Sequence, residues 1–328
     1  GSPLLLLLLP LSWVFGWMAE RRRQQLLASG PYRAAVPLIV VGNITAGGTG
    51  KTPLCIALAR HFTAQGLKVV IVSRGYGGNS AVYPLIVNAE SDPQQAGDEA
   101  VLLAQQGRCA VVVDPDRVRA VKLAESRLQA QLILSDDGLQ HYALGRTLEL
   151  AVVDGERGLG NGCLLPAGPL REPAQRLCNV DIVVTNGPLR QPLPIAAVRQ
   201  FTMALEPTGL VNLASGERLS VGEWQQRHGT ANPVHAVAGI GNPGRFFASL
   251  QQLGFVIMPQ AFGDHHAYNA GEVAFFDMAP LVMTSKDAVK CRHFAQRHWW
   301  MLEVEAVLPM EFYATLQHLL PRLSQQLP

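Results

Sequence analysis

The chain has 328 residues, of which 48% are hydrophobic and only 16% are charged, and its net charge is +2. At about 150 residues per domain its length suggests two domains, and its apolar content excludes a disordered chain. The small net charge gives no support for nucleic-acid binding, which needs Lys and Arg clustered on one face. The five cysteines form no C-x-x-C pair, so neither a disulfide framework nor a zinc site is indicated.

The N-terminal segment at residues 4–19 is apolar on every face, and the first charged residue is Glu20. A helix of these 16 residues would cover about 24 Å, less than the roughly 30 Å of a hydrocarbon core, and Pro10 interrupts its middle. Arginines follow at residues 21–23, whereas a secretory signal carries its positive charges before the apolar run. We therefore expect a monotopic membrane helix, with one true span and a buried helix as the alternatives.

From residue 37 onward, short runs rich in Val, Ile and Leu alternate with stretches of helical composition. Such runs are typical of strands that are buried on both faces of a parallel sheet, with helices in the crossovers. The first half of the chain is therefore predicted to be a doubly wound, mainly parallel α/β domain. Its expected strands are residues 38–41, 69–73, 110–114, 132–136, 150–154 and 181–185.

A proline-rich stretch at residues 188–194 breaks this pattern, and an extended segment at 199–213 follows it, with a turn expected at 206–209. A smaller α/β series comes next, with strands expected at 235–240, 255–260, 281–284 and 299–305, helices beginning near Gly244 and Ala288, and a last helix over 310–327. We predict three parts, namely an N-terminal membrane-associated helix (1–30), a nucleotide-binding domain (31–195), and linker strands with a smaller α/β domain (196–328).

Residues 42–53 read GNITAGGTGKTP, between the first expected strand and a helical stretch. In such a loop, successive backbone N–H groups bind phosphate oxygens, Lys51 reaches the terminal phosphates and Thr52 ligates Mg²⁺. The common pattern G-x-x-x-x-G-K-[ST] has Gly where this chain has Thr45. The motif predicts a P-loop NTPase-type domain in which ATP is bound by Thr45, Ala46, Gly47, Gly48, Thr49, Gly50, Lys51 and Thr52.

A P-loop site needs a carboxylate at the end of a neighbouring strand, where it holds Mg²⁺ directly or through water. Asp136 and Asp137 stand at the end of the strand expected at 132–136. Adjacent strand residues point to opposite faces, so which of the two binds the metal directly stays open. Paired Asp before Gly is also common in turns, and Asp114 and Asp154 end other strands as rival ligands.

The ordered motifs of the chain resemble those of the tetraacyldisaccharide 4'-kinases, which phosphorylate the lipid A precursor. They are GNITAGGTGKTP (42–53), SRGYGG (73–78), AGDE (96–99), SDDGLQH (135–141), LPAGPLREP (165–173), GIGNPGRFF (239–247), DHHAY (264–268) and TSKDAVK (284–290). The loop with Thr45 is similar to this family's own version, whereas Ser285 stands where similar kinases often carry Glu.

The resemblance implies ATP- and Mg²⁺-dependent transfer of a γ-phosphoryl group to the 4'-hydroxyl of an acylated glucosamine disaccharide 1-phosphate, with lipid IVA as product. It also implies a place at the cytoplasmic face of the bacterial inner membrane, because the acyl chains stay in the membrane while the hydroxyl must reach ATP. The expected partners are this disaccharide and membrane lipid, without nucleic acid.

Individual roles also follow from the resemblance. Asp98 of AGDE would orient or deprotonate the attacking hydroxyl, with His265 as its partner, and Lys51 would act on the transferring phosphoryl group. Residues assigned to the acceptor are Arg74, Tyr76, Gly77 and Arg171.

Structural explanations compete with these roles. A single histidine is more often a core or surface group than a catalyst, SRGYGG alone would be a glycine turn, and Glu99 would only support Asp98. Lys286 is a candidate nucleotide contact, but a helix capped by Ser explains its segment equally well.

A membrane-cycling P-loop switch ATPase is the alternative function, because an apolar terminal helix suits it too. Such switches resemble one another in carrying an extra lysine early in the loop, where this chain has Thr45 and Ala46. The missing lysine disfavours this alternative.

Overall fold

The computed structural model describes residues 3–195, 198–273, 275 and 278–320. Its helices are α1 (Pro3–Ala28), α2 (Lys51–Ala64), α3 (Pro93–Ala96), α4 (Asp98–Gln106), α5 (Arg117–Ser126), α6 (Val221–His228), α7 (Pro243–Gln252), α8 (Ala270–Val273), α9 (Ser285–Cys291) and α10 (Met310–Leu319). The strands of the first half are β1 (Tyr32–Arg33), β2 (Leu38–Gly42), β3 (Val69–Ser73), β4 (Leu85–Val87), β5 (Ala110–Val113), β6 (Leu132–Asp136), β7 (Leu144–Gly145), β8 (Leu148–Asp154) and β9 (Ile182–Asn186). Those of the second half are β10 (Arg199–Asn212), β11 (Arg218–Leu219), β12 (Val234–Ala238), β13 (Ile257–Ala261), β14 (Leu281–Thr284) and β15 (Trp299–Val307).

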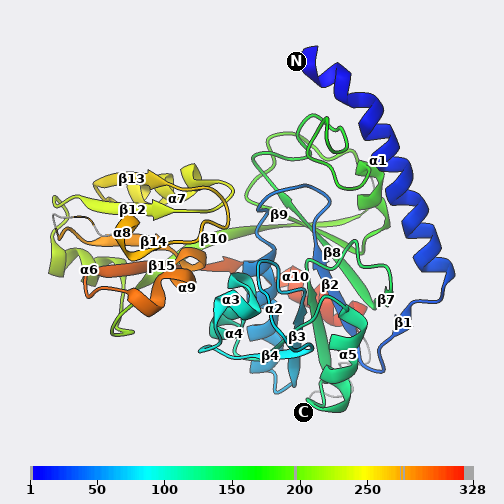
Figure 1. Cartoon of the computed structure of the whole chain (residues 1–328), viewed down its shortest axis with the longest axis horizontal. Helices are drawn as coiled ribbons and strands as arrows, with labels where there is room; N and C mark the ends of the chain where they lie inside the picture. Colours follow the sequence, from blue (N-terminus) through cyan, green and yellow to red (C-terminus); the bar gives the residue numbers. More distant parts are fainter. Residues whose placement is uncertain (1–2, 196–197, 274, 276–277, 321–328) are drawn as a thin grey trace.

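The first unit is built on the strand order β9-β8-β2-β6-β3-β5-β4, in which every pair is parallel except β4 with β5. Strands β2, β3 and β6 are buried throughout because their Val, Ile and Leu side chains fill both faces. Helix α2 packs into the core on one face, and α5 packs into the core on the other. The predicted α/β class with a mainly parallel, doubly wound sheet is confirmed (Figure 1).

Strand β10 joins the first unit to the second. Its residues 199–203 pair in parallel with β9, and its residues 204–212 pair antiparallel with β15. The turn expected at 206–209 is wrong, because the strand continues through it and the register only shifts between Pro207 and Gly209. A bulge accommodates a proline, which has no N–H to donate to a ladder.

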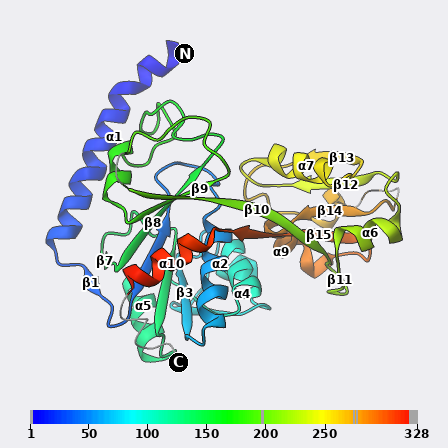
Figure 2. The ribbon, with the colours of Figure 1, turned by 180° about the vertical axis from the view of Figure 1, so that it is seen from behind.

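The second unit continues the same sheet with the order β13-β12-β14-β15, and these four strands are parallel. Its core holds large side chains, among them Trp224, Phe246 and Trp300. Figures 1 and 2 show the two units side by side, with β10 and β15 running between them. The proposed domain limits at 30 and 195 stay a prediction.

Helix α10 returns to the first unit, where Phe312 and Leu316 enter the core beside α2. It ends at Leu319, and residues 321–327 of the expected helix lie outside the described residues.

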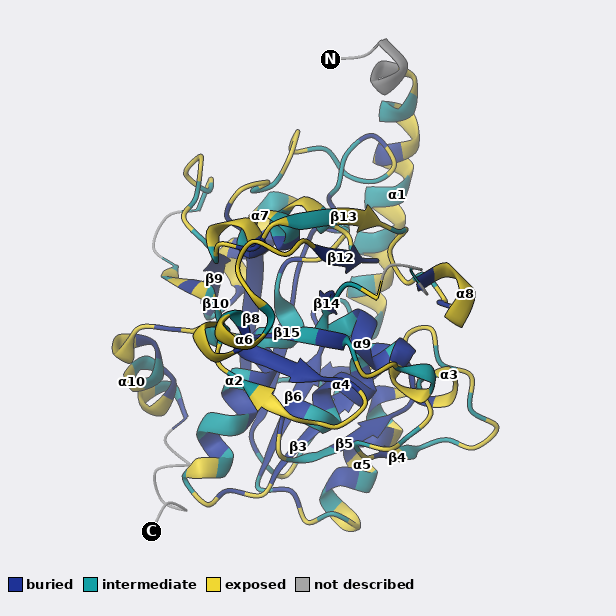
Figure 3. Ribbon diagram, turned by 90° about the vertical axis from the view of Figure 1, so that its left-hand side faces the viewer, coloured by how far each residue is buried: buried dark blue, intermediate teal, exposed yellow. Residues whose placement is uncertain are grey.

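Helix α1 has 26 residues and continues through Pro10, so the expected interruption is wrong. A proline removes one hydrogen bond of the helix ladder, and the turns on both sides keep theirs. In the described part of the chain, no helix is long and apolar enough to cross a membrane. Much of α1 is exposed (Figure 3), including the apolar side chains of Leu7, Leu11, Trp13, Val14, Trp17 and Met18.

Candidate active site

A cavity of about 840 Å³ lies between the two units. The first unit contributes the phosphate loop at residues 48–52 and Glu99 at the start of α4, and the second contributes residues of α7, β14, α9 and β15. The cavity therefore opens at the carboxyl end of β2, the edge at which open α/β sheets bind ligands.

The phosphate loop follows β2 and ends where α2 begins. Gly47 and Gly50 have φ values of 92° and 98°, which favour glycine, and a Cβ on Gly50 would lie 2.6 Å from Asn186 Nδ2. This Asn186 amide donates a hydrogen bond to the Thr49 carbonyl at 3.1 Å. The Thr49 hydroxyl is buried and makes no hydrogen bond with a described residue, so it remains available to a ligand of the loop.

The beginning of the loop is fastened to the segment LPAGPLREP. Thr45 forms an isolated bridge with Leu170, and the Ala46 N–H donates to the Pro169 carbonyl at 2.7 Å. The N–H of Ala46 is therefore engaged within the protein, whereas the N–H groups of residues 47–50 donate to none of the described residues.

Asp136 and Asp137 lie at the end of β6 and face different neighbours. Asp136 Oδ1 accepts a 3.6 Å hydrogen bond from the Cys55 thiol. Asp137 Oδ1 lies 3.5 Å from Lys51 Nζ, and its Oδ2 lies 3.4 Å from Arg171 Nη1. Asp137 is thus the carboxylate of the pair that faces the phosphate-loop lysine.

The two carboxyl groups have opposite pKa shifts. Burial raises the pKa of Asp136 to about 7, and the neighbouring carboxylates act in the same direction. Burial also opposes the ionisation of Asp137, but the positive charges of Lys51 and Arg171 help to outweigh it, so the pKa of Asp137 is lowered. Asp137 is the one kept ionised beside the loop.

The rival ligands Asp114 and Asp154 are held by arginines. Arg119 Nε donates to Asp114 Oδ2 at 2.5 Å, and Arg157 Nη2 lies 3.5 Å from Asp154 Oδ2. Among the described residues, no three His, Cys, Asp or Glu side chains gather as a metal-binding group.

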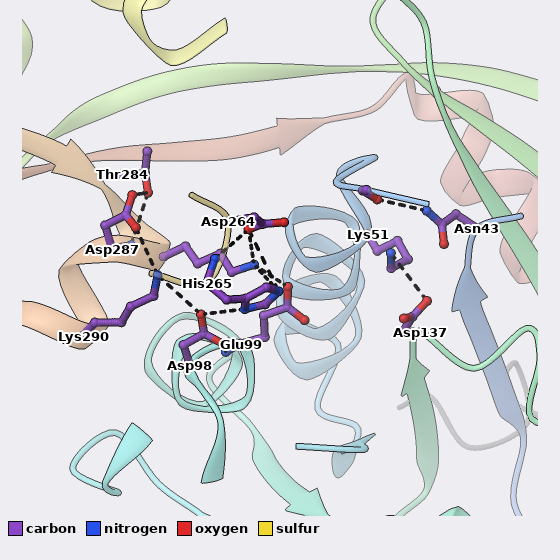
Figure 4. Close-up of polar contacts among 12 residues, drawn as sticks. Asn43, Lys51, Asp98, Glu99, Asp137, Asp264, His265, Thr284, Asp287 and Lys290 are labelled. Carbon is purple, nitrogen blue, oxygen red and sulfur yellow. Dashed lines mark hydrogen bonds and ion pairs between the residues drawn. The ribbon is translucent and has the colours of Figure 1, made fainter. Parts of the chain in front are cut away.

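Asp98 and His265 come from different units and meet at the edge of the cavity. Asp98 is the first residue of α4 and is buried, and its Oδ2 lies 3.5 Å from His265 Nδ1. Its Oδ1 accepts a hydrogen bond from the Glu99 N–H at 2.9 Å. Figure 4 shows both side chains gathered with Glu99 and Asp264 in one group, and Lys51 with Asp137 in another.

Two lysines of α9 complete this group. Lys286 Nζ lies 3.0 Å from Glu99 Oε1 and 3.5 Å from Asp264 Oδ1, and Lys290 Nζ lies 3.9 Å from Asp98 Oδ2. Burial opposes the charge of Lys286, but the surrounding carboxylates outweigh it and raise its pKa. Sequence reasoning did not assign Lys290, although its spacing of four from Lys286 places both on one helix face.

Two of the residues assigned to the acceptor lie beside these two groups, namely Tyr76 beside His265 and Arg171 beside Asp137. Tyr76 is 62% exposed, and its ring centroid lies 5.0 Å from that of His265. Arg74 is exposed, and Gly77 has a positive φ of 78°. The motif SRGYGG of the first unit is thus brought beside the DHHAY motif of the second.

The family model described as tetraacyldisaccharide-1-P 4'-kinase matches residues 4–321. The chain is 48% identical to the tetraacyldisaccharide 4'-kinase of Ectopseudomonas mendocina, over 98% of this chain and 95% of that protein. It is 47% identical to the enzyme of Pseudomonas aeruginosa, over 98% and 96% of the two chains. The crystal structure of LpxK from Aquifex aeolicus in complex with ATP is similar, with a TM-score of 0.80 and 28% identity over 97% of this chain and 99% of that one.

Proposed function

The chain belongs to the tetraacyldisaccharide-1-phosphate 4'-kinase family, and on this premise we propose that phosphoryl transfer from ATP takes place in the cavity between its two units. The acceptor is the 4'-hydroxyl of an acylated glucosamine disaccharide 1-phosphate. The observation that carries this proposal is that the phosphate loop and the residues flanking the Asp98–His265 pair line one cavity.

The phosphate loop would hold ATP through the backbone N–H groups of its glycine-rich part. The N-terminus of α2 adds its positive dipole at the same place. Lys51 Nζ stands at the loop end of the cavity, where its charge would stabilise the transferring phosphoryl group.

The Asp98–His265 pair would prepare the acceptor. A sugar hydroxyl must lose its proton as its bond to phosphorus forms, and an imidazole next to a carboxylate accepts a proton readily. Tyr76 and Arg74, on the first unit, would hold the sugar headgroup beside His265. Lys290, whose Nζ lies 3.9 Å from Asp98 Oδ2, would help to hold the Asp98 side chain in place.

The residues present also fit Mg²⁺. Asp137 Oδ1 is buried and accepts no hydrogen bond from a described residue, and Thr52 stands in the first turn of α2. Asp137, Thr52 and Asp136 would hold the ion, which in such sites usually keeps several waters and phosphate oxygens as its other ligands. When bound, Mg²⁺ neutralises charge on the phosphates.

Coupling of ATP consumption to the acceptor tests the proposed function. The purified protein should consume ATP in step with phosphorylation of the acylated disaccharide, and hardly at all without it. A switch ATPase would instead hydrolyse ATP at a rate that does not depend on the disaccharide.

Helix α1 is proposed to seat the protein on the cytoplasmic face of the inner membrane. Removing residues 4–19 takes away most of the exposed apolar side chains described in this helix and leaves Leu27, so the shortened protein should bind lipid vesicles much less. Sedimentation with vesicles measures this, and the exchange Val256→Ser, at an exposed apolar residue of the second unit, is the control. Unchanged sedimentation of the shortened protein would place the membrane contact elsewhere.

A further inference from the structure

We propose that Arg245 of the second unit contacts the γ-phosphoryl group of ATP and stabilises its charge during transfer. This inference rests on the proposed kinase reaction and adds a catalytic residue from the motif GIGNPGRFF, to which the sequence analysis gave no role.

The segment that carries Arg245 lies against the phosphate loop. A Cβ on Gly241 would be 3.4 Å from the Gly48 backbone nitrogen and 3.4 Å from Asp264 Oδ2. Helix α7 begins two residues later, at Pro243, and Arg245 is in its first turn. The motif GIGNPGRFF thus brings a cationic side chain from the second unit to the loop that would hold the phosphates.

Arg245 is connected to the loop through a single side chain. Its Nη2 donates to Asn186 Oδ1 at 2.9 Å, and Asn186 Nδ2 in turn donates to the Thr49 carbonyl at 3.1 Å. Asp154 Oδ2, at 3.8 Å from Arg245 Nη1, faces the guanidinium from β8. These partners aim the guanidinium at the glycine-rich part of the loop.

The guanidinium of Arg245 keeps donors available for a ligand. Only one of its N–H groups makes a hydrogen bond with a described residue, and the side chain lines the cavity with 35% of its surface exposed. A planar guanidinium matches phosphate oxygens in a bidentate arrangement and stays charged at any working pH. Arg245 is therefore suited to bind an anion at this end of the cavity.

Asp154 has a structural role in this arrangement, which differs from the metal-ligand role considered for it. Its carboxylate is buried and accepts hydrogen bonds from the N–H groups of Glu156 and Arg157 at 3.0 and 2.9 Å. It therefore fixes the turn after β8 and lies beside two arginines, Arg157 and Arg245.

Arg157 differs from Arg245 in what it holds. Its Nη2 donates to the Gly48 carbonyl, so its guanidinium supports the backbone of the loop. The cavity lining among the described residues includes Arg245 but not Arg157. Arg245 is thus the arginine of this pair that faces the substrate side.

The chemistry of transfer explains why a second cation is needed opposite Lys51. Negative charge is spread over the oxygens of the transferring group, and an arginine that contacts it is worth several powers of ten in rate in other P-loop enzymes. Lys51 approaches from the loop, and Arg245 would approach from the second unit. The reaction would then require both units around one phosphoryl group.

The variants Arg245→Gln and Arg245→Lys, with Arg227→Gln as control, test this role. Arg227 is an exposed arginine of the same unit, paired with Glu217 away from the cavity. Arg245→Gln should lower kcat at least about 10²-fold, while KM for ATP changes less than about threefold. Arg245→Lys should recover only part of the loss, and Arg227→Gln should behave like the wild type.

A measurement of nucleotide binding without the acceptor distinguishes two roles of Arg245. The residue either contacts the γ-phosphoryl group or only supports the phosphate loop. Arg245→Gln should bind ADP as the wild type does but bind ADP with aluminium fluoride, a mimic of the transferring group, at least about 10-fold more weakly. A folded Arg245→Gln variant with normal kcat, or with equal losses for both ligands, would overturn the proposal. If the wild type failed to phosphorylate the disaccharide, the proposed function would fall, and this binding comparison would still decide the role of Arg245.

Discussion

Replacing Asp98 or His265 by alanine is expected to lower turnover by about 10²–10⁴-fold, and the double variant should be little worse than the more damaging single one. The reason is that His265 Nδ1 and Asp98 Oδ2 lie 3.5 Å apart and would accept the proton of the acceptor hydroxyl as one unit. Groups that acted independently would give losses that multiply, because their contributions to the barrier would add.

The measurement compares turnover of the wild type, both single variants and the double variant at saturating ATP. The KM for ATP should change little, because the pair acts on the acceptor. His266→Ala is the matched control, since this neighbouring imidazole faces Glu272, at 3.3 Å. Fully multiplicative losses would contradict the proposal that Asp98 and His265 act as one unit. An active Asp98→Ala enzyme would make Asp136 or Asp137 the candidate base.

Replacing Lys51 by alanine should lower the rate of phosphorylation at least about 10²-fold and leave the fold intact. The substitution removes a positive charge at the transferring group, and it leaves Arg171 and Arg117 as cations that act on Asp137. Turnover is measured beside Lys68→Ala, an exposed lysine of the same unit, and circular dichroism checks folding. Near-normal phosphorylation by a folded Lys51→Ala enzyme would remove this lysine from the site.

The fold was largely predictable because its signals are local. Continuous runs of Val, Ile and Leu marked the buried strands of the first unit, whose observed limits differ from the expected ones by at most two residues. The turn expected at 206–209 was a wrong prediction, which arose because the sequence Glu-Pro-Thr-Gly is typical of a turn. Pairing of β10 with β15 over eight residue pairs kept the strand extended there and reduced the irregularity to a bulge.

The site was predictable only one motif at a time. The phosphate loop can be recognised from its own residues. Asp98 and His265 were assigned through a family resemblance. Contacts such as Lys290 with Asp98, or Arg245 with Asn186, join residues far apart in the chain. They depend on how β10 and β15 orient the second unit against the first. That orientation cannot be predicted from composition or from the spacing of motifs.

The destination of the γ-phosphoryl group distinguishes a lipid kinase from an ATPase. The protein is incubated with γ-labelled ATP, Mg²⁺ and acylated glucosamine disaccharide 1-phosphate in lipid vesicles, and the lipid and aqueous fractions are separated. Label should appear in the lipid as a phosphate on the 4'-hydroxyl, in proportion to the ATP consumed. Label that appeared only as free phosphate would contradict phosphoryl transfer to the disaccharide.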